Sequence, residues 1–462
     1  MITMNDYIDR IRNKSIGVLG VGVSNLPLIN TLLEHGIHDI TACDARPEEE
    51  LGDTCNDLIS KGVSLQLGEH YLDSLPFDVI FRTPGLMPFD QHLVKARDNG
   101  SVITSEMEAF FEICPCKIIA VTGSDGKTTT TTIISELLKQ EGYRVHLGGN
   151  IGKPLFSEVE SFKPEDIAVL ELSSFQLHSM KCHPDISVIT NISPNHLDKH
   201  IDYPDYYNSK SNIFINQDGN DVLILNAKDE LSEYYAGLSH SNIKYFSRDM
   251  KVDDGVYCDD KHIYFSHKPN EEMIMDIADI RLPGVHNLEN YLAAICAVGD
   301  LVSHDTCRIV AREFGGVEHR LEFVRDWKGI TFINDSIGTS PTRTIAGLHS
   351  MKKKPILIAG GYDKDIPFDE LGVAINDLCK AVFLTGHTAE KIEKAVVEAD
   401  NFEKEKILLK MVDDFTECVM DAAHYAEKGD IVLLSPACAA FDHFKNFAER
   451  GTFFKNLVNT LE

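Results

Sequence analysis

One segment constrains the fold of this chain more than any other: the unbroken apolar run Lys117–Thr122, which leads directly into the glycine-rich sequence TGSDGKTTT at residues 122–130. An apolar run of this length is typical of a strand that is buried on both faces of a parallel sheet. A helical pattern then continues through Glu141. The strand, the turn and the helix together predict a βα unit, so the rest of the chain has to fit an α/β sheet.

The same segment predicts a site for phosphate groups. Its glycines allow backbone N–H groups to turn toward an anion, and the following helix presents the positive end of its dipole. Lys127 would hold the β- and γ-phosphates of a nucleotide, and the hydroxyl of Thr128 would join a magnesium shell. The spacing is tighter than in the usual P-loop, whose first glycine would fall at Val121, and the alternative is a plain glycine-rich turn. The residues expected to surround the ATP phosphates are Thr122, Gly123, Ser124, Asp125, Gly126, Lys127, Thr128 and Thr129.

Three blocks of alternating strand and helix patterns follow one another along the chain. The first contains SIGVLG, a helical pattern over Asn25–Glu34, and DITACD; the second contains KIIAVT, AVLEL, ISVITN and a period-two hairpin at residues 255–266. The third contains ITFIND, PILIAG, AVFLTG and DIVLLSPA. We therefore expect an α/β fold of three domains: a Rossmann-like domain (1–112), a central P-loop ATPase-like parallel sheet with a small antiparallel insertion (113–316), and a second Rossmann-like domain (317–462).

Composition restricts the partners of the protein. The formal net charge of -28 argues against a nucleic-acid or anionic membrane surface, because such partners require clustered Lys and Arg. The sequence shows neither a signal core nor an apolar run of the roughly 20 residues that a membrane span needs. Its eleven cysteines form no CxxC pair, which predicts reduced thiols and no zinc site. We expect a cytoplasmic protein that binds small molecules.

A second glycine-rich turn lies in the first block. It runs from Gly20 to Asn25 after the first predicted strand, and Asp44 ends the next strand as a ribose ligand would. Asn25 stands where a dinucleotide-binding loop has its third glycine. The turn is therefore compatible with a nucleotide site or with a plain tight turn. A NAD-dependent dehydrogenase is one alternative, but it would have to explain the stronger phosphate loop of the second block.

Two candidate metal ligands follow predicted strand ends. Glu171 ends AVLEL, and His196 lies just beyond ISVITN, so both would lie at the carboxyl edge of the sheet, where α/β proteins bind ligands. A lone histidine after a strand is more often structural, but the position of His196 beside a phosphate loop reverses that preference, and both residues could reach a magnesium ion near the phosphates. Lys210, by composition alone, would be a solvated surface lysine.

The ordered set of these segments resembles the Mur ligase family. The resemblance rests on TGSDGKTTT, GGNIG (148–152), ELSSFQL (171–177), NISPNHLDKH, GVHNLENYLAA, EHRLE and SPACAAFDHFKNF, and it covers essentially the whole chain. ELSSFQL and SPACA are closest to the members that add D-glutamate to UDP-N-acetylmuramoyl-L-alanine in peptidoglycan synthesis. A folylpolyglutamate synthase would share the phosphate loop but not these two segments.

The resemblance implies an ATP-dependent ligase that forms an amide through an acyl phosphate, with cations on the transferring phosphoryl group. It implies two magnesium ions, with metal ligands Thr128, Glu171 and His196, and a Lys210 that is carbamylated to supply a further anionic group. The implied catalytic residues are Lys127, His196, Lys210 and His319. The implied ATP contacts outside the phosphate loop are Asn287, Asn290, Arg320 and Asp335.

The resemblance also implies where the other substrates bind. The UDP-linked substrate would contact Val23, Ser24, Asp44, Arg46 and Asn150, and D-glutamate would contact Lys364, Ala440 and Phe447. The chain departs from the family pattern at Asn195, where an acid precedes the metal histidine, at Ile337, where a lysine is frequent, and at Ala440, where a serine hydroxyl would contact the amino acid. We expect a monomer whose domains close on their ligands.

An ATP-hydrolysing binding or switch protein is the competing hypothesis from another class. A GTPase switch would contain the base-reading motif N-K-x-D, whereas Asn226 and Asp229 enclose Ala and Lys in a different order. Guanine recognition therefore has no support in the sequence. ATP turnover that depends on both a carboxylate and an amine would separate a ligase from a switch.

Overall fold

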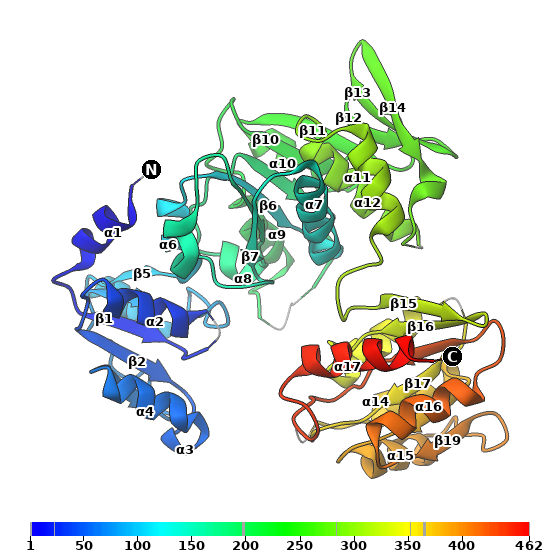
Figure 1. The fold of residues 1–462 in the computed structure, drawn as a ribbon. Helices are drawn as coiled ribbons and strands as arrows, with labels where there is room; N and C mark the ends of the chain where they lie inside the picture. Colours follow the sequence, from blue (N-terminus) through cyan, green and yellow to red (C-terminus); the bar gives the residue numbers. More distant parts are fainter. Residues whose placement is uncertain are drawn as a thin grey trace. The chain divides into compact units, whose positions relative to one another are not determined.

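The computed structural model describes residues 2–22, 24–195, 199–282, 284–351, 353–363 and 366–461. The chain forms two compact units, Met1–Phe314 and Gly315–Glu462 (Figure 1). The first unit contains two sheets and the second contains one, all built largely from parallel strands, so the α/β class is confirmed. The unit boundary lies close to the expected boundary at 316, whereas the expected boundary at 112 falls inside the first unit and stays a prediction.

The N-terminal part of the first unit is a five-stranded, fully parallel sheet with the order β3-β2-β1-β4-β5. This arrangement fits the Rossmann-like pattern expected from the sequence. Its strands are β1 (Ile16–Leu19), β2 (Ile40–Asp44), β3 (Ser64–Leu67), β4 (Val79–Phe81) and β5 (Val102–Thr104). Its helices are α1 (Met4–Ile11), α2 (Asn25–Glu34), α3 (Glu48–Leu51), α4 (Asp53–Ser60), α5 (Gln91–Asp98) and α6 (Glu106–Ile113).

The remainder of the first unit is a nine-stranded sheet with the order β14-β13-β12-β11-β10-β9-β6-β8-β7. Its strands are β6 (Lys117–Thr122), β7 (Val145–Gly149), β8 (Ile167–Glu171), β9 (Ile186–Ile189), β10 (Val222–Asn226), β11 (Asn242–Ser247), β12 (Asp254–Cys258), β13 (His262–His267) and β14 (Asn270–Asp276). Its helices are α7 (Lys127–Glu141), η1 (Phe156–Ser161), α8 (Ser174–Leu177), α9 (Tyr203–Ser211), α10 (Ser232–Leu238), η2 (Ile277–Asp279), α11 (Val285–Val298) and α12 (His304–Glu313).

Strand β6 explains why the sheet reads as unbroken apolar runs. Ile118 and Ala120 belong to one hydrophobic core, and Ile119 and Val121 belong to the core on the opposite face. Since successive side chains of a strand point to opposite faces, a strand covered on both faces needs apolar residues at every position. The parallel neighbours of β6 are β8 and β9, so the carboxyl ends of all three strands meet at one edge.

The expected antiparallel insertion is also present, at the far edge of this sheet. Strands β12 and β13 pair antiparallel, and β14 adds a further antiparallel strand. The turn of the hairpin is closed by Asp259, whose Oδ1 accepts hydrogen bonds from the backbone N–H groups of Lys261 and His262, both at 2.7 Å. A short acidic side chain that bonds its own turn is a common way to form such a connection.

The second unit contains a six-stranded sheet with the order β15-β16-β20-β17-β18-β19. All its pairs are parallel except the edge pair, in which β15 runs antiparallel to β16. The sequence pattern predicted β16 but not β15. Its strands are β15 (Glu322–Trp327), β16 (Ile330–Asn334), β17 (Ile356–Ala359), β18 (Ala381–Leu384), β19 (Leu408–Met411) and β20 (Ile431–Leu434). Its helices are α13 (Pro341–Ser350), α14 (Asp369–Leu378), α15 (Ala389–Glu398), α16 (Phe415–Tyr425) and α17 (Phe447–Asn459).

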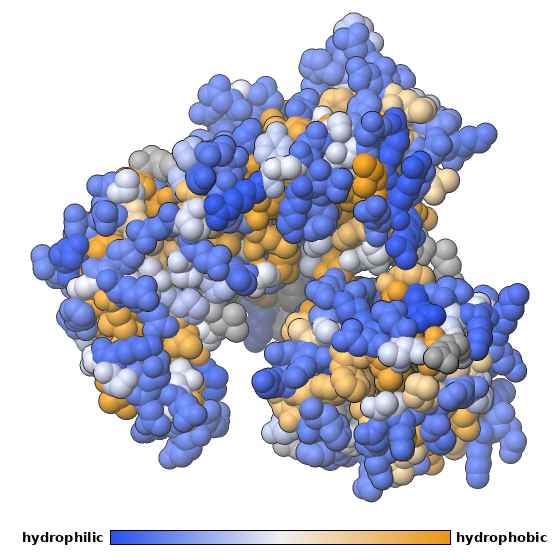
Figure 2. Space-filling model, viewed as in Figure 1, coloured by the Kyte–Doolittle hydropathy of each residue, from blue (hydrophilic) through white to orange (hydrophobic). Residues whose placement is uncertain are grey.

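Hydrophilic side chains cover much of the face drawn in Figure 2, with hydrophobic side chains visible between them. This distribution agrees with the large negative charge of the chain, -28. In the described ranges, no helix combines the length and the apolar character that crossing a bilayer would require.

We predict that Ile119→Ala destabilises the first unit by about 3 kcal/mol, because a fully buried side chain on the central strand β6 would leave a cavity. Hydrogen exchange measured by mass spectrometry should show faster exchange in peptides from β6, β8 and β9. Met250→Ala is the control, since Met250 is 53% exposed and its truncation opens no cavity. Equal exchange in the two variants would contradict the assignment of β6 as the centre of the core.

Candidate active site

The phosphate loop has the backbone that the sequence predicted. It connects β6 to α7, and Gly126 precedes α7 in a left-handed conformation with φ of 77°. A Cβ at Gly126 would collide with Oδ1 of Asn290, and a Cβ at Gly123 would collide with Oγ1 of Thr190. Both glycines are therefore required by close approach as well as by conformation.

Two lysines converge on this loop. Lys127 Nζ donates hydrogen bonds to the carbonyl oxygens of Gly123 (3.0 Å) and Ser124 (2.9 Å). Lys210 Nζ, from α9, donates to the same Gly123 oxygen at 2.8 Å. The lysine that composition alone would leave on the surface is 1% exposed. The Gly123 carbonyl oxygen therefore accepts hydrogen bonds both from Lys127 of the loop and from Lys210 of α9.

The environment of Lys210 favours its neutral form. Burial lowers the pKa of the amine well below its ordinary value, and the charge of Lys127 lowers it further, whereas Glu171 acts in the opposite direction. The amine also lies 4.7 Å from the centroid of the Tyr206 ring. Both the burial and the neighbouring charge of Lys127 therefore act against the protonated, charged form of this amine.

Glu171 ends β8 at the same edge of the sheet. Its Oε1 accepts a hydrogen bond from Asn150 Nδ2 at 2.7 Å, and its backbone carbonyl accepts one from Asn150 N at 2.7 Å. Its Oε2 is buried, with no hydrogen-bond partner among the described residues. A buried carboxylate oxygen without a partner is costly unless a cation or water reaches it. The donor chemistry at Glu171 therefore fits an oxygen-seeking cation such as Mg²⁺.

Helix α11 supports the loop from the other side. Asn290 is 6% exposed, and its Oδ1 accepts a hydrogen bond from Thr130 Oγ1 at 3.2 Å. Its Nδ2 donates to Oδ1 of Asn287, also at 3.2 Å. Both asparagines that the family resemblance assigned to ATP thus lie at the base of the phosphate loop.

Helix α9 bonds to the loop at a second point. The hydroxyl groups of Tyr206 and Ser124 lie 2.8 Å apart, and Ser124 Oγ also donates to the carbonyl of Ser193 at 2.9 Å. Asp125 is fixed by Asn191, whose Oδ1 accepts from the Asp125 N–H at 3.0 Å. Side chains after β9 and on α9 therefore hold the loop in shape from outside the βα unit.

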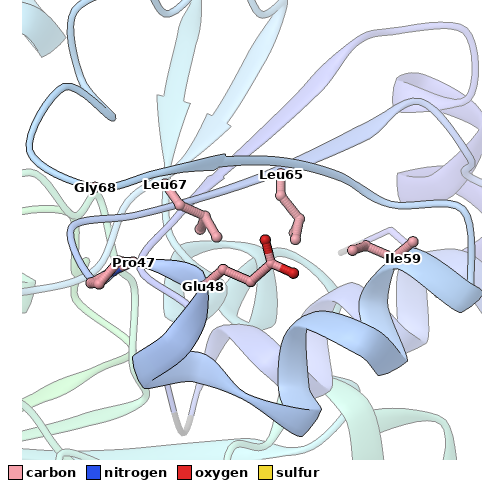
Figure 3. Close-up of a pocket in the computed structure, with 6 residues that line it drawn as sticks. All are labelled: Pro47, Glu48, Ile59, Leu65, Leu67 and Gly68. Carbon is pink, nitrogen blue, oxygen red and sulfur yellow. The ribbon is translucent and has the colours of Figure 1, made fainter.

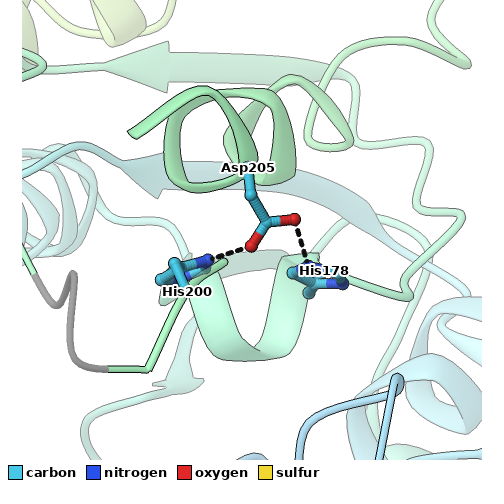
Figure 4. Close-up of side chains that lie close together, drawn as sticks. All are labelled: His178, His200 and Asp205. Carbon is cyan, nitrogen blue, oxygen red and sulfur yellow. Dashed lines mark hydrogen bonds and ion pairs between the residues drawn. The ribbon is translucent and has the colours of Figure 1, made fainter. Parts of the chain in front are cut away.

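Asp205 of helix α9 forms a cluster with His178 and His200 (Figure 4). The two histidines bond different oxygens of the same carboxylate, His178 Nε2 at 2.8 Å and His200 Nδ1 at 2.9 Å. Burial lowers the pKa of His200, and the hydrogen bond to the Asp205 carboxylate opposes that shift. The sequence reading missed this cluster, although His200 stands only four residues beyond the candidate ligand His196.

The candidate UDP site centres on Asp44 at the end of β2. Asp44 Oδ2 accepts hydrogen bonds from Val21 N at 2.7 Å and from Arg46 at 2.9 Å. Burial acts to raise the pKa of Asp44, but the hydrogen bonds from Arg46 and Val21 lower it overall to about 2. Ser24 precedes α2 on the neighbouring turn. The carboxylate therefore stays charged and holds the turn and Arg46 together.

A pocket of about 460 Å³ adjoins this site (Figure 3). Leu65 and Leu67 of β3 line one side, and Ile59 and Glu48 line the other. The pocket joins the Asp44 site through Gly68, whose N–H donates to the Asp44 carbonyl at 2.9 Å. The lining combines the apolar side chains of Ile59, Leu65 and Leu67 with the carboxylate of Glu48, which points in among them.

The second unit contains its own group of candidate residues. His319 has a positive φ of 62°, and its Nδ1 lies 3.0 Å from Asn334 Nδ2, which can only donate, so the ring proton lies on Nε2. Burial lowers the pKa of His319. Burial raises the pKa of Asp335 to about 6, although Ser435 Oγ donates to its Oδ2 at 2.7 Å. Arg320 is exposed.

Ala440 and Phe447 lie in the same unit, around the segment after β20. Ala440 is 2% exposed, and the ring of Phe447 lies 6.1 Å from that of His319. Arg450 holds this segment: its guanidinium donates to the carbonyl oxygens of Cys438 (3.0 Å) and Ala439 (3.1 Å). Burial lowers the pKa of Arg450 to about 10. A buried arginine that the sequence patterns did not single out therefore fixes the backbone directly before Ala440.

The expected site residues thus form three groups, of which the first is the candidate UDP site around Asp44 and Arg46. The first unit also brings Lys127, Lys210 and Glu171 to one sheet edge, and the second unit gathers His319, Asp335 and Phe447 around β16 and β20. Three expected residues, Val23, His196 and Lys364, lie outside the described residues.

We predict that Gly126→Ala weakens ATP binding at least about tenfold, a loss of roughly 1.4 kcal/mol, because the new Cβ meets the fixed Asn290 side chain. Isothermal titration calorimetry measures the affinity. The control is Gly142→Ala at the other end of α7: its φ of 108° is equally unusual for alanine, but no atom lies within 4 Å of the added Cβ. Loss of binding in both variants would point to general strain rather than to the loop.

Two family models match the chain. The Mur ligase middle domain matches residues 121–298, and the Mur ligase, glutamate ligase domain matches residues 319–438. Among solved structures, the fold resembles that of UDP-N-acetylmuramate-alanine ligase MurC from Thermotoga maritima, with a TM-score of 0.54, 17% identity, and 97% and 100% of the two chains covered. It also resembles MurF from Acinetobacter baumannii, with a TM-score of 0.57, 15% identity and 99% of both chains covered. At these identities the likeness concerns the fold alone.

Sequence similarity to curated proteins is higher. The chain is 48% identical, over 99% of both chains, to UDP-N-acetylmuramoylalanine–D-glutamate ligase of Acetivibrio thermocellus. It is 47% identical, again over 99% of both, to the protein of the same name from Clostridium novyi. With identity of this level along its full length, and with the phosphate loop and sheet edge described above, the chain belongs to the Mur ligase family.

Proposed function

We propose that this chain is an ATP-dependent ligase that joins D-glutamate to UDP-N-acetylmuramoyl-L-alanine in peptidoglycan precursor synthesis. The names of its full-length relatives support the choice of substrates. The observation that carries the chemistry is the buried carboxylate of Glu171, whose Oε2 is without a hydrogen-bond partner in the described part of the chain, beside a loop that holds two lysines. Such a site suits phosphoryl transfer assisted by a divalent cation.

In the proposed reaction, a carboxylate oxygen of the alanyl group attacks the γ-phosphorus of ATP, and the bond to ADP breaks. The amine of D-glutamate then attacks the acyl carbon, phosphate leaves, and the amine releases its surplus proton. The products are an amide, ADP and phosphate. Lys127 would leave its two loop carbonyls for the phosphates, so that its charge follows the transferring group.

Thr128, Glu171 and His196 would hold magnesium, and two ions are proposed. Magnesium, when bound, neutralises negative charge on the transferring phosphoryl group. The buried amine of Lys210 would add to carbon dioxide to form a carbamate, with release of one proton. This exchange would replace a potential cation by an anion near Glu171. The low pKa of the amine supports the proposal, because addition requires the neutral form.

The remaining residues would bind the substrates. Ser24, Asp44 and Arg46, with Val23, would hold the UDP group, and the pocket beside β3 supports this assignment because it adjoins Asp44. Asn150 would contact the UDP-linked substrate, and it would also orient Glu171 through its hydrogen bond to that carboxylate. Asn287, Asn290, Arg320 and Asp335 are proposed for ATP, and Lys364, Ala440 and Phe447 for D-glutamate, with His319 near the reacting groups.

The cellular setting is part of the proposal. The eleven cysteines are all free and buried, which supports a reducing compartment, and we propose the cytoplasm. We also propose a monomer, and three parts, 1–112, 113–316 and 317–462, that bind the UDP substrate, ATP and the amino acid respectively.

We predict that phosphate release from ATP requires both UDP-N-acetylmuramoyl-L-alanine and D-glutamate. A coupled phosphate assay with a panel of amino acids, including L-glutamate, L-alanine and L-lysine, measures this dependence. Turnover without either co-substrate would favour an ATP-hydrolysing switch protein. A folate with L-glutamate as the better pair would favour the folylpolyglutamate type of ligase.

We predict that Lys210→Ala lowers kcat at least about 100-fold, because the buried carbamate that positions the charge would be lost. Formate or acetate should restore part of the rate, since a small carboxylate can enter the space left by the side chain. Lys139→Ala is the matched control: Lys139 lies on α7, is half-exposed and pairs with Glu136 at the surface. Unchanged kcat in Lys210→Ala would remove the carbamate from the mechanism.

A further inference from the structure

We propose that His200 is a positioning residue for the ligase reaction. It fixes helix α9, which carries Lys210, to helix α8, which follows Glu171. The kinetic part of this inference rests on the proposed function, whereas its structural part does not.

The His200 ring is completely enclosed, with 0% of its side chain exposed. Its Nδ1 bonds Asp205 Oδ2 at 2.9 Å, and its Nε2 bonds Ser174 Oγ at 3.0 Å. Phe175 stacks on one side at 5.5 Å, and Tyr206 meets the ring edge-on at 5.2 Å. Both ring nitrogens form hydrogen bonds to α8 or α9, and both aromatic neighbours of the ring also belong to these helices. These contacts together hold the ring in place between the two helices.

Asp205 extends this connection to the other end of α8. Its Oδ1 bonds Nε2 of His178, the residue that ends α8, at 2.8 Å. Its Oδ2 also accepts the N–H of Ile201 at 3.2 Å. Helix α8 is therefore tied to the first turn of α9 at both of its ends, through Ser174 and through His178.

Helix α9 also reaches the phosphate loop, through Tyr206 in its first half and Lys210 near its end. Tyr206 follows Asp205 directly, and its hydroxyl lies 2.8 Å from Ser124 Oγ. Lys210, one turn further along the helix, donates to the Gly123 carbonyl at 2.8 Å. Since an α-helix moves as a rigid element, a shift of its first turn would move both contacts. Displacement of a catalytic group by about 1 Å can lower the rate roughly 100-fold.

The side chains of His178, His200 and Asp205 lie close enough together to suggest a metal site, because their possible ligand atoms are all within 4.8 Å of one another. Each of those atoms already bonds another member of the cluster or its neighbour Ile201. A metal would have to displace these hydrogen bonds. We therefore assign the cluster to the positioning of α9.

His200→Phe tests this assignment, because phenylalanine keeps an aromatic ring against Phe175 and removes both hydrogen bonds. We expect kcat to fall about tenfold, with KM for ATP and for both other substrates within about twofold of wild type. We also expect faster hydrogen exchange in peptides covering α9, with α7 and the second unit unchanged. Loss of packing alone would not produce the split between kcat and KM.

The matched control is His183→Phe. His183 also pairs with an aspartate, Asp221, at 2.6 Å, but its side chain is 51% exposed and the pair lies before β9 and β10 rather than on α9. This variant should keep the wild-type kcat and the wild-type exchange of α9. If His200→Phe does not fold, His178→Phe tests the same carboxylate from its outer side, with an expected fall in kcat of about threefold.

The inference would be overturned if His200→Phe kept the wild-type hydrogen exchange of α9 or the wild-type kcat. The same outcomes apply to His178→Phe where that variant is used instead. If the wild-type protein shows no turnover that depends on D-glutamate, the proposed function fails, but hydrogen exchange still decides whether His200 positions α9. Faster exchange together with an equal loss of kcat in the His183 control would also count against a specific role.

Discussion

The carbonyl oxygen of Gly123 is the contact on which the candidate site depends. It accepts hydrogen bonds from two lysines that are 83 residues apart in the sequence, Lys127 on the loop's own helix and Lys210 on α9. The loop contact brings two amines together, and burial and the charge of Lys127 both lower the pKa of Lys210, which favours its neutral form. The geometry of the loop and the ionisation of the lysine are therefore aspects of a single interaction.

Much of the fold follows from the local sequence. The central strands read as unbroken apolar runs because both faces of the sheet are covered, as Ile118 and Ile119 show by entering opposite cores. Helix α7 begins at Lys127 and ends at Glu141, where the pattern placed it, because glycines bound it on both sides. The edge strand β15 gave no such signal, since its residues are only partly buried and its pattern is mixed.

The partners of polar side chains were harder to predict. The strand pattern alone placed Glu171 at the sheet edge, whereas Lys210 could be placed at the site only through the family resemblance, because nothing in the local sequence shows that it would be buried. Asn150 bonds Glu171, and Asp335 bonds Ser435, contacts made across long sequence separations. Hydrogen bonds of this kind depend on which strands become neighbours in the sheet. Hydrophobic periodicity and secondary-structure propensity are local properties of the sequence and do not indicate which strands pair.

The burial of all eleven cysteines, noted above as a sign of a reducing compartment, has a practical consequence. A thiol reagent can modify these side chains only after the surrounding packing opens, so the labelling rate of each cysteine measures a local opening event. Cys114 and Cys116 directly precede β6, and Arg450 donates a hydrogen bond to the backbone carbonyl of Cys438. The native cysteines therefore report on motion near the phosphate loop and near the site residues of the second unit, and no cysteine has to be engineered into the chain for this purpose.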